Sequence, residues 1–466
     1  MMLRERKMGY VLAGAPGVRR TGSSQLSRSV RPDRLSLMLK LIIVGLFLPE
    51  ELSFYIFGLR LTVIRLLFLV VVPLLVVRFS KKLSAGNYRF IPSDLLVVAA
   101  GCWLIYAPAN VDDPFSALNH AGPTVLEFCV GYFVTRLILS EKGAALSFAN
   151  VFCLTVAIVA WIGSLDPLTN SRFIHDFAAQ LTAPMHSFLD WSDAYRFGLL
   201  RASGPVEHPI LFGFICAIGL LVALAIPVRA RLFVIVSCCM GTMISFSSAP
   251  IQVMIMGLAL LVYDKLLAGL HYRWSILIGV AIAAVVAAFT FSSNPVGFVI
   301  SHLTFSPESG YYREWTWALV DQYVSQSPWF GLGFGELPEE INHSIDSLWL
   351  VLSIQAGVPG AVLVGLSLIG ATPIFTRGRE PGLSSEELRL KGVIGIVLFL
   401  TIYISFTVHL WGTAWILTGL LVGVKAHLSE LGYLASRLSA PREHWNAAKR
   451  LGGVNVSRKL RPVQGG

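Results

Sequence analysis

Long apolar runs separated by short polar segments are the feature that most constrains this chain. A helix needs about 20 mostly apolar residues to cross the hydrocarbon core of a bilayer. About twelve such runs occur, at residues 36–49, 59–78, 92–108, 121–139, 144–164, 208–227, 231–247, 250–268, 273–292, 347–375, 390–408 and 410–426. The first run and the last two are short for complete spans. The sequence therefore predicts an all-α polytopic membrane protein with about 12 transmembrane helices.

The composition agrees with this prediction. The chain has 466 residues, of which 55% are hydrophobic and 14% charged, whereas soluble domains have about 25% charged residues. The remaining polar segments are too scattered to form a separate soluble domain. We expect a basic N-terminal segment (1–35), a transmembrane domain (36–426) and a basic tail (427–466). The larger loops, at about 165–207 and 293–346, are predicted to be external and to contain short surface helices.

Basic residues are distributed unevenly over the loops. Clusters of Lys and Arg occur in residues 4–34, 78–89, 229–231, 265–273 and 377–391 and in the tail, whereas the opposite side has a few Arg and no Lys. An excess of basic residues marks cytoplasmic loops, so we expect both termini in the cytoplasm. These clusters are short and adjoin apolar runs, and they do not indicate nucleic-acid binding. The six Cys lie within predicted spans without metal-site spacing, and we interpret them as packing residues.

Charged residues also occur inside predicted spans. Arg65 and Glu127 each lie about two helical turns from the outer end of a run. Charges at such depth are costly, which makes them candidates for function. They are equally explained if they pair with each other or reach water, and both interpretations stay open.

The first external loop contains two stretches with helical spacing, residues 173–181 and 187–200, which predict helices on the membrane surface. The loop ends in Arg-Ala-Ser-Gly-Pro-Val-Glu-His-Pro, in which Pro209 can begin a helix. Arg201, Glu207 and His208 thus gather at the outer mouth of a span. An ordinary turn and helix start is the competing interpretation, and we favour a functional role.

The second external loop contains an expected amphipathic helix at about 310–325, with Arg313 and Trp317 one turn apart on one face. A Gly-rich turn follows, without the preceding strand that a dinucleotide site requires. The next span opens with His343-Ser-Ile-Asp-Ser. If this helix begins at Ser344, His343 and Asp346 lie within one turn of each other. Asp346 could instead only cap the helix.

Three segments resemble the O-antigen ligase / O-antigen polymerase superfamily of bacterial envelope polysaccharide enzymes. They are R-x-S-G-P-x-x-H-P at 201–209, R-E-W-T-W-A-L…S-P-W-F-G-L-G-F-G at 313–335, and H-S-I-D-S-L-W-L-V-L-S-I-Q-A-G-V-P-G at 343–360. The resemblance covers the second half of the chain, and the first half only by topology. Family ligases usually have His where this chain has Asp346, and an Arg where Ala249 follows Ser247-Ser248. These departures favour the polymerase branch.

The resemblance implies glycosyl transfer at the periplasmic face of the bacterial inner membrane. The donor would be an oligosaccharide on undecaprenyl pyrophosphate, the product O-antigen or exopolysaccharide, and the reaction would need no metal or cofactor. Implied partners are this lipid-linked oligosaccharide, membrane lipid and a chain-length regulator.

Within that resemblance, Arg201 and Arg313 are expected to face one external cavity and hold the pyrophosphate, because guanidinium groups stabilise its negative charge. His208, Glu207 and Trp317 are further candidate substrate contacts. We expect His343 to be the base for the acceptor hydroxyl, with Asp346 as its partner. Asp346 as the base is the alternative. Two other functions stay open: a ligase that transfers polymer to lipid A-core, and a flippase for lipid-linked sugars, although transporters tend to have charges near the bilayer midplane in two related halves.

Overall fold

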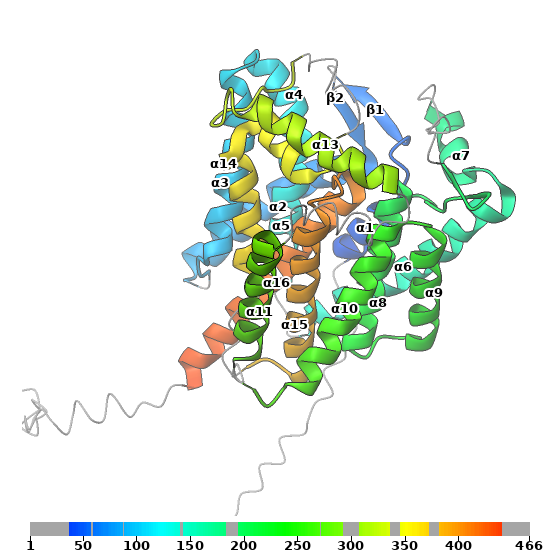
Figure 1. Cartoon of the computed structure of the whole chain (residues 1–466). Helices are drawn as coiled ribbons and strands as arrows, with labels where there is room; N and C mark the ends of the chain where they lie inside the picture. The colour runs from blue at the N-terminus through cyan, green and yellow to red at the C-terminus, as the bar shows by residue number, and fades with distance from the viewer. Residues whose placement is uncertain are drawn as a thin grey trace, which may run out of the picture.

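The computed structural model describes residues 37–56, 59–86, 88–139, 143–182, 194–270, 272–291, 307–335, 345–371 and 382–439. In these ranges the chain is mostly helical, with two short antiparallel hairpins (Figure 1). The prediction of a helical fold is thus confirmed in outline.

In its described ranges, the first half of the chain has thirteen elements. They are α1 (Leu37–Gly45), β1 (Ser53–Ile56), β2 (Leu59–Thr62), α2 (Val63–Ser84), α3 (Pro92–Tyr106), the 3-10 turn η1 (Pro108–Asn110), α4 (Pro114–Val125), the π-helical turn η2 (Leu126–Val130), α5 (Gly131–Ile138), α6 (Ala144–Thr169), α7 (Phe173–Thr182), β3 (Tyr195–Arg196) and β4 (Leu199–Leu200).

The second half is helical throughout its described ranges. Its elements are α8 (Pro209–Ala225), α9 (Arg231–Ile244), α10 (Ser248–Leu266), α11 (Arg273–Phe291), α13 (Pro307–Val324), α14 (Leu348–Ala371), α15 (Ser385–Ile404) and α16 (Gly412–Ser439). Nearly every residue of α8 is buried, so this helix lies at the centre of the bundle. Helix α16 continues through the predicted domain boundary at 426 without a break.

Six helices in the described ranges are long and apolar enough to cross a bilayer: α2, α3 with η1, α6, α10, α14 and α16. Helices α8 and α9 and the first part of α11 are apolar but shorter. The predicted number of about twelve spans is therefore not confirmed. The first predicted run holds only the 9 residues of α1, which extend about 14 Å and cannot cross the hydrocarbon core.

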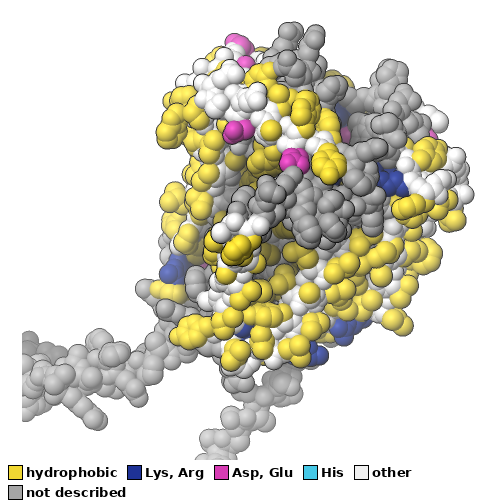
Figure 2. Space-filling model, viewed as in Figure 1, with side chains coloured by type: hydrophobic (Ala, Val, Ile, Leu, Met, Phe, Trp, Pro, Cys, Tyr) yellow, Lys and Arg dark blue, Asp and Glu magenta, His cyan; other side chains and the backbone are white. Residues whose placement is uncertain are grey.

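The helices run between two ends of the bundle (Figure 1). One end carries the β1–β2 hairpin, α7 and α13, and we call it the loop end. The starts of α8, α10, α14 and α16 contact the loops of this end. In Figure 2, Lys and Arg side chains gather toward the opposite end, below a belt that is mostly hydrophobic.

Small residues let α16 pack closely against η2 and α5. A Cβ at Gly419 would lie 2.5 Å from the carbonyl oxygen of Phe128, and one at Gly423 would lie 2.2 Å from that of Tyr132. Such spacing of small residues is typical of membrane helices in contact. The Thr135 hydroxyl adds a 2.8 Å hydrogen bond to the carbonyl oxygen of Leu420.

Helix α14 contains a break that receives the Gly-rich turn after α13. Gly357 has φ 70° and ψ 173°, a conformation almost restricted to glycine. The Leu332 N–H donates to the carbonyl oxygen of Ile354 at 2.6 Å, and the Val358 N–H donates to that of Pro328 at 2.9 Å. Two segments of the family resemblance thus interlock through their backbones.

The structure corrects the last part of the second surface helix predicted in the first external loop. Residues 194–200 form the β3–β4 hairpin instead, with the pairs Tyr195–Leu200 and Arg196–Leu199. The two residues between the strands, Phe197 and Gly198, both have positive φ, which suits a tight hairpin turn. Residues 187–193 lie outside the described ranges. The two other predicted loop helices are confirmed as helices, α7 and α13, while their position on the membrane surface stays a prediction.

Candidate functional site

Arg201 is enclosed at the loop end. The residue is 2% exposed. Its guanidinium donates to the carbonyl oxygen of Ser245, at 3.3 Å, and to the hydroxyl of Ser247. Arg201 therefore fastens the segment before α8 to the turn between α9 and α10. A role of Arg201 in holding substrate stays a prediction, because in this conformation the side chain is buried.

The backbone that follows Arg201 is held by an acidic side chain. Asp166, near the end of α6, accepts hydrogen bonds from the N–H groups of Ser203 and Gly204, both at 2.8 Å. Arg172 donates to the Ser203 hydroxyl at 3.2 Å. Gly204 also lies against α6 so closely that a Cβ would come within 3.0 Å of Gly163. The motif residues Ser203 and Gly204 thus shape a buried turn.

Glu207 and His208 cap two different helices. Glu207 Oε1 accepts a hydrogen bond of 2.9 Å from the Thr413 N–H in the first turn of α16. His208 Nδ1 accepts one of 3.1 Å from the Ile210 N–H at the start of α8. Because Nδ1 accepts, a neutral His208 ring carries its proton on Nε2. The pair links α8 with α16.

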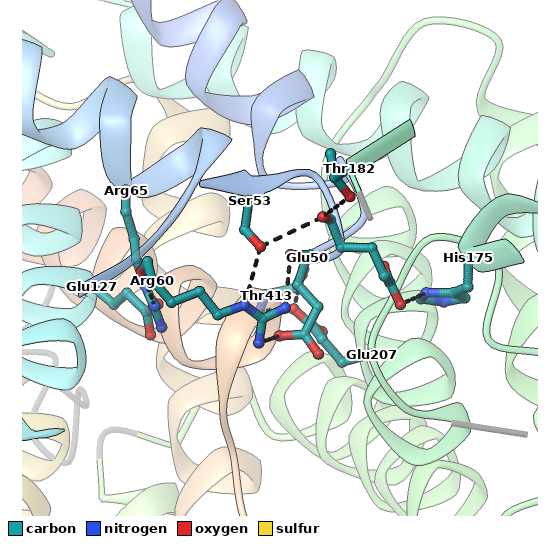
Figure 3. A network of polar contacts seen from close by, with 10 residues as sticks. Glu50, Ser53, Arg60, Arg65, Glu127, His175, Thr182, Glu207 and Thr413 are labelled. Atoms are coloured by element: carbon teal, nitrogen blue, oxygen red, sulfur yellow. Dashed lines mark hydrogen bonds and ion pairs between the residues drawn. The ribbon is translucent and has the colours of Figure 1, made fainter. Parts of the chain in front are cut away.

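A network of ion pairs lies beside Glu207 (Figure 3). Arg60 lies 3.5 Å from a carboxylate oxygen of Glu50 and donates to the Glu50 carbonyl oxygen at 2.8 Å. Arg65 forms a 2.8 Å ion pair with Glu127 and donates to the Arg60 carbonyl oxygen at 2.9 Å. Pairing of Arg65 with Glu127 was one of the two interpretations from sequence, and it is confirmed.

His175, on α7, is the cation of a third pair. Its Nδ1 lies 2.7 Å from Glu51 Oε1, and its Nε2 lies 3.2 Å from the carbonyl oxygen of Val206. A carbonyl only accepts hydrogen bonds, so Nε2 is protonated, and an ionised Glu51 requires a proton on Nδ1 as well. Burial opposes the charge on His175, but the hydrogen bond and the charge of Glu51 raise the pKa of this histidine overall.

Arg313 and Asp346 form the more accessible part of the site. The guanidinium lies 3.7 Å from Asp346 Oδ2, and the side chains are 14% and 38% exposed. The predicted helix start at Ser344 is wrong, because α14 begins at Leu348 and residues 345–347 are not helical. His343 lies outside the described residues. The argument that helical spacing brings His343 and Asp346 together therefore no longer holds.

The loop between α15 and α16, residues 405–411, contacts both parts of the site. On one side, the Leu348 N–H of α14 donates to the carbonyl oxygen of Ser405 at 3.1 Å. Trp317 of α13 donates to the carbonyl oxygen of Phe406 at 3.2 Å and stacks on its ring, with centroids 6.0 Å apart. Trp317, a predicted substrate contact, thus also fastens α13 to this loop.

On its other side the same loop reaches the Glu207–His208 pair. The ring of Trp411 lies 5.7 Å from that of His208 and 5.3 Å from that of His409. Burial lowers the pKa of His409 to about 4, so this imidazole is neutral near pH 7. The segments that contain Arg201, Glu207 and His208, and those that contain Arg313, Trp317 and Asp346, therefore meet through one loop.

Several residues of this region were not singled out from the sequence. Glu50 and Glu51 follow an apolar run that was expected to be a span, and Asp166 lies at the end of another. The signal in the sequence that could have identified Glu50 and Glu51 is that two adjacent carboxylates directly follow an apolar run too short for a span. Thr413 is uncharged and 206 positions from Glu207, so local pattern carries no information about their contact. In the described part of the chain, no three His, Cys, Asp or Glu side chains are placed to hold a metal ion.

A scan against protein-family models finds no match for this chain, and a search of the curated proteins finds none either.

Proposed function

We propose that this protein is a membrane glycosyltransferase of the polymerase type. It would join oligosaccharide units carried on undecaprenyl pyrophosphate into O-antigen or exopolysaccharide at the periplasmic face. The observation that supports the proposal is that all three motif-bearing segments contact the 405–411 loop, the first through His208, the second through Trp317 and the third through Leu348.

The charges of the site suit a pyrophosphate donor. Arg313 is partly exposed, and its ion-pair contact with Asp346 at 3.7 Å is longer than a strong charged hydrogen bond. A phosphate group with better geometry can replace the carboxylate.

Release of Asp346 from Arg313 provides a free carboxylate near the bound donor. Such a group can take the proton of an acceptor hydroxyl as the new glycosidic bond forms. Asp346 is thus favoured as the base by its position beside Arg313, while His343 stays the alternative.

Profiles of lipid-linked and surface polysaccharide from a deletion strain test the reaction class. Single repeat units on lipid at the periplasmic face indicate a polymerase. Polymer that is complete but not attached to lipid A-core indicates a ligase. Units retained on the cytoplasmic leaflet indicate a flippase, and either of these last two results contradicts the proposal.

Substitution of Arg313 tests the site itself. Arg313→Lys keeps the charge but loses the planar fork that contacts a phosphate through two hydrogen bonds, and we expect at least about a 10-fold loss of polymer, equal to about 1.4 kcal/mol in the transition state. Arg273→Lys is the matched control, since it weakens a 2.8 Å Arg–Asp ion pair between α10 and α11. Normal polymer in Arg313→Lys at unchanged protein level would exclude this role.

The assignment of the base follows from two further variants. If Asp346→Asn is inactive and His343→Ala is active, Asp346 is the base. The reverse result assigns the role to His343.

A further inference from the structure

Four glutamates lie in and around the network of Figure 3, and three of them have a cationic partner. The pairs are Glu50 with Arg60, Glu51 with His175, and Glu127 with Arg65. For Glu207, the structure as described shows no cation within ion-pair distance. Glu207 is nevertheless only 6% exposed. It is therefore a buried carboxyl group for which a proton, rather than a cation, can neutralise the charge.

The hydrogen bonds of Thr413 point to such a proton. The Thr413 hydroxyl oxygen lies 2.9 Å from Glu207 Oε1 and 3.1 Å from the carbonyl oxygen of Leu46. A hydroxyl has one proton, and a carbonyl can only accept. If Thr413 donates to Leu46, the contact with Glu207 needs a proton on the carboxyl group. A protonated Glu207 therefore satisfies both contacts, whereas an ionised one leaves one of them without a proton.

The second carboxyl oxygen agrees with a neutral group. Glu207 Oε2 is buried and has no hydrogen-bond partner among the described residues. An ionised carboxylate with an oxygen in this state is strongly disfavoured. The N-terminus of α16 and the Thr413 N–H favour the ionised form, but this helix effect is the smaller one. Burial and the nearby charge of Glu50 together raise the pKa of Glu207 to about 7.

We propose that Glu207 is a proton-binding site whose proton joins the loop after α1 to the start of α16. Glu50, on that loop, acts on Glu207 through its charge, and Arg60 of β2 pairs with Glu50. His208 is next to Glu207 in the sequence, and Trp411 contacts the rings of both His208 and His409. Loss of the proton places a second carboxylate beside Glu50 and leaves the Thr413 hydroxyl with one proton for two acceptors, Glu207 and the Leu46 carbonyl oxygen. One of these two contacts is then lost, which weakens the attachment at the start of α16. The site exists whatever reaction the protein catalyses.

Infrared difference spectroscopy of the full-length protein in nanodiscs, titrated with acid and base, tests the proposal. A protonated buried carboxyl group gives a carbonyl band that shifts in heavy water and disappears as pH rises. We expect this band in the wild type, its loss in Glu207→Gln, and its retention in Glu51→Gln. Glu51 is the matched control because it is buried nearby and is paired with His175. A band that persists in Glu207→Gln, or that disappears only in Glu50→Gln, overturns the assignment.

A second measurement needs no substitution. A hydrophobic carbodiimide modifies protonated carboxyl groups, and mass spectrometry locates the product on the chain. For a group with a pKa near 7, the modified fraction at Glu207 should fall about 100-fold between about pH 5 and about pH 9. Equal modification at both pH values, or none at either, contradicts a titrating proton at this residue.

Discussion

Gly357 offers a sharp test of how the site is held together. A Cβ at this position would lie 2.1 Å from the carbonyl oxygen of Trp329, and this neighbour is backbone that cannot rotate away. Gly357→Ala therefore has to push the Gly-rich turn out of the break in α14. The turn directly follows α13, which contains Arg313, so the substitution can displace Arg313 without touching it.

The expected cost has two parts. Strain of a non-glycine residue at φ 70° and ψ 173° costs about 1–3 kcal/mol. Separation of the turn breaks the hydrogen bonds from Leu332 to Ile354 and from Val358 to Pro328, each worth about 0.5–1.5 kcal/mol. We expect the free energy of unfolding to fall by about 2–6 kcal/mol, a large share of the about 5–15 kcal/mol typical of folded proteins.

Thermal unfolding of the purified protein in detergent measures the effect, and Gly365→Ala is the control. Gly365 lies on the same helix, and a Cβ there would be 3.7 Å from the Trp349 ring, an ordinary contact. The control should unfold within a few degrees of the wild type, whereas Gly357→Ala should unfold well below it. If the two variants unfold at the same temperature, the interlock does not contribute to stability and the reasoning is refuted.

Two further predictions concern buried charge. The pKa of Glu207 is raised from its ordinary value of 4.5 to about 7. Protonated Glu207 therefore contributes about 3 kcal/mol to the free energy of unfolding, which is fully present below about pH 4.5 and is lost as the pH rises to about 7. Unfolding curves at several pH values should show this loss in the wild type but not in Glu207→Gln, and an equal dependence of the unfolding free energy on pH in both would contradict the prediction. Arg65→Ala and Glu127→Ala should each cost about 3–5 kcal/mol, because either leaves a buried charge without its partner. The double variant should cost clearly less than the sum, and additive costs in a double-mutant cycle would exclude the coupling.

The sequence predicted those parts of the fold that depend on local pattern. The surface helices α7 and α13 follow from apolar spacing, and Pro209 begins α8 as expected. The pairing of Arg65 with Glu127 was recognisable because two opposite charges at similar depth in apolar runs each need a partner.

Other features depend on contacts between distant segments. In the sequence Gly357 looks like any other glycine of an apolar helix. Its importance depends on the backbone of Trp329, which lies against it in the fold. Strand β2 consists of the first residues of a predicted apolar run, which continues as α2. The pairing of β2 with β1, from Ser53–Thr62 to Ile56–Leu59, makes these residues a strand and not the first turn of the helix. Arg201 was expected to be an open cation, yet neighbouring carbonyl and hydroxyl groups enclose it. Local hydropathy contains no information on any of these partners.

Helix α16 is fixed near its start and again at Glu430, before its last turns, and this has a mechanical consequence. Near its start, Thr413 is bound to Glu207, and 17 residues later Glu430 forms an ion pair with Arg136, which also contacts Asp94 at 3.1 Å. The two attachments are about 26 Å apart along a continuous helix. Such a rod cannot slide along its axis at one end without straining the attachment at the other. A spectroscopic label placed after Glu430 would therefore report movements that begin at Thr413, on the far side of the bundle.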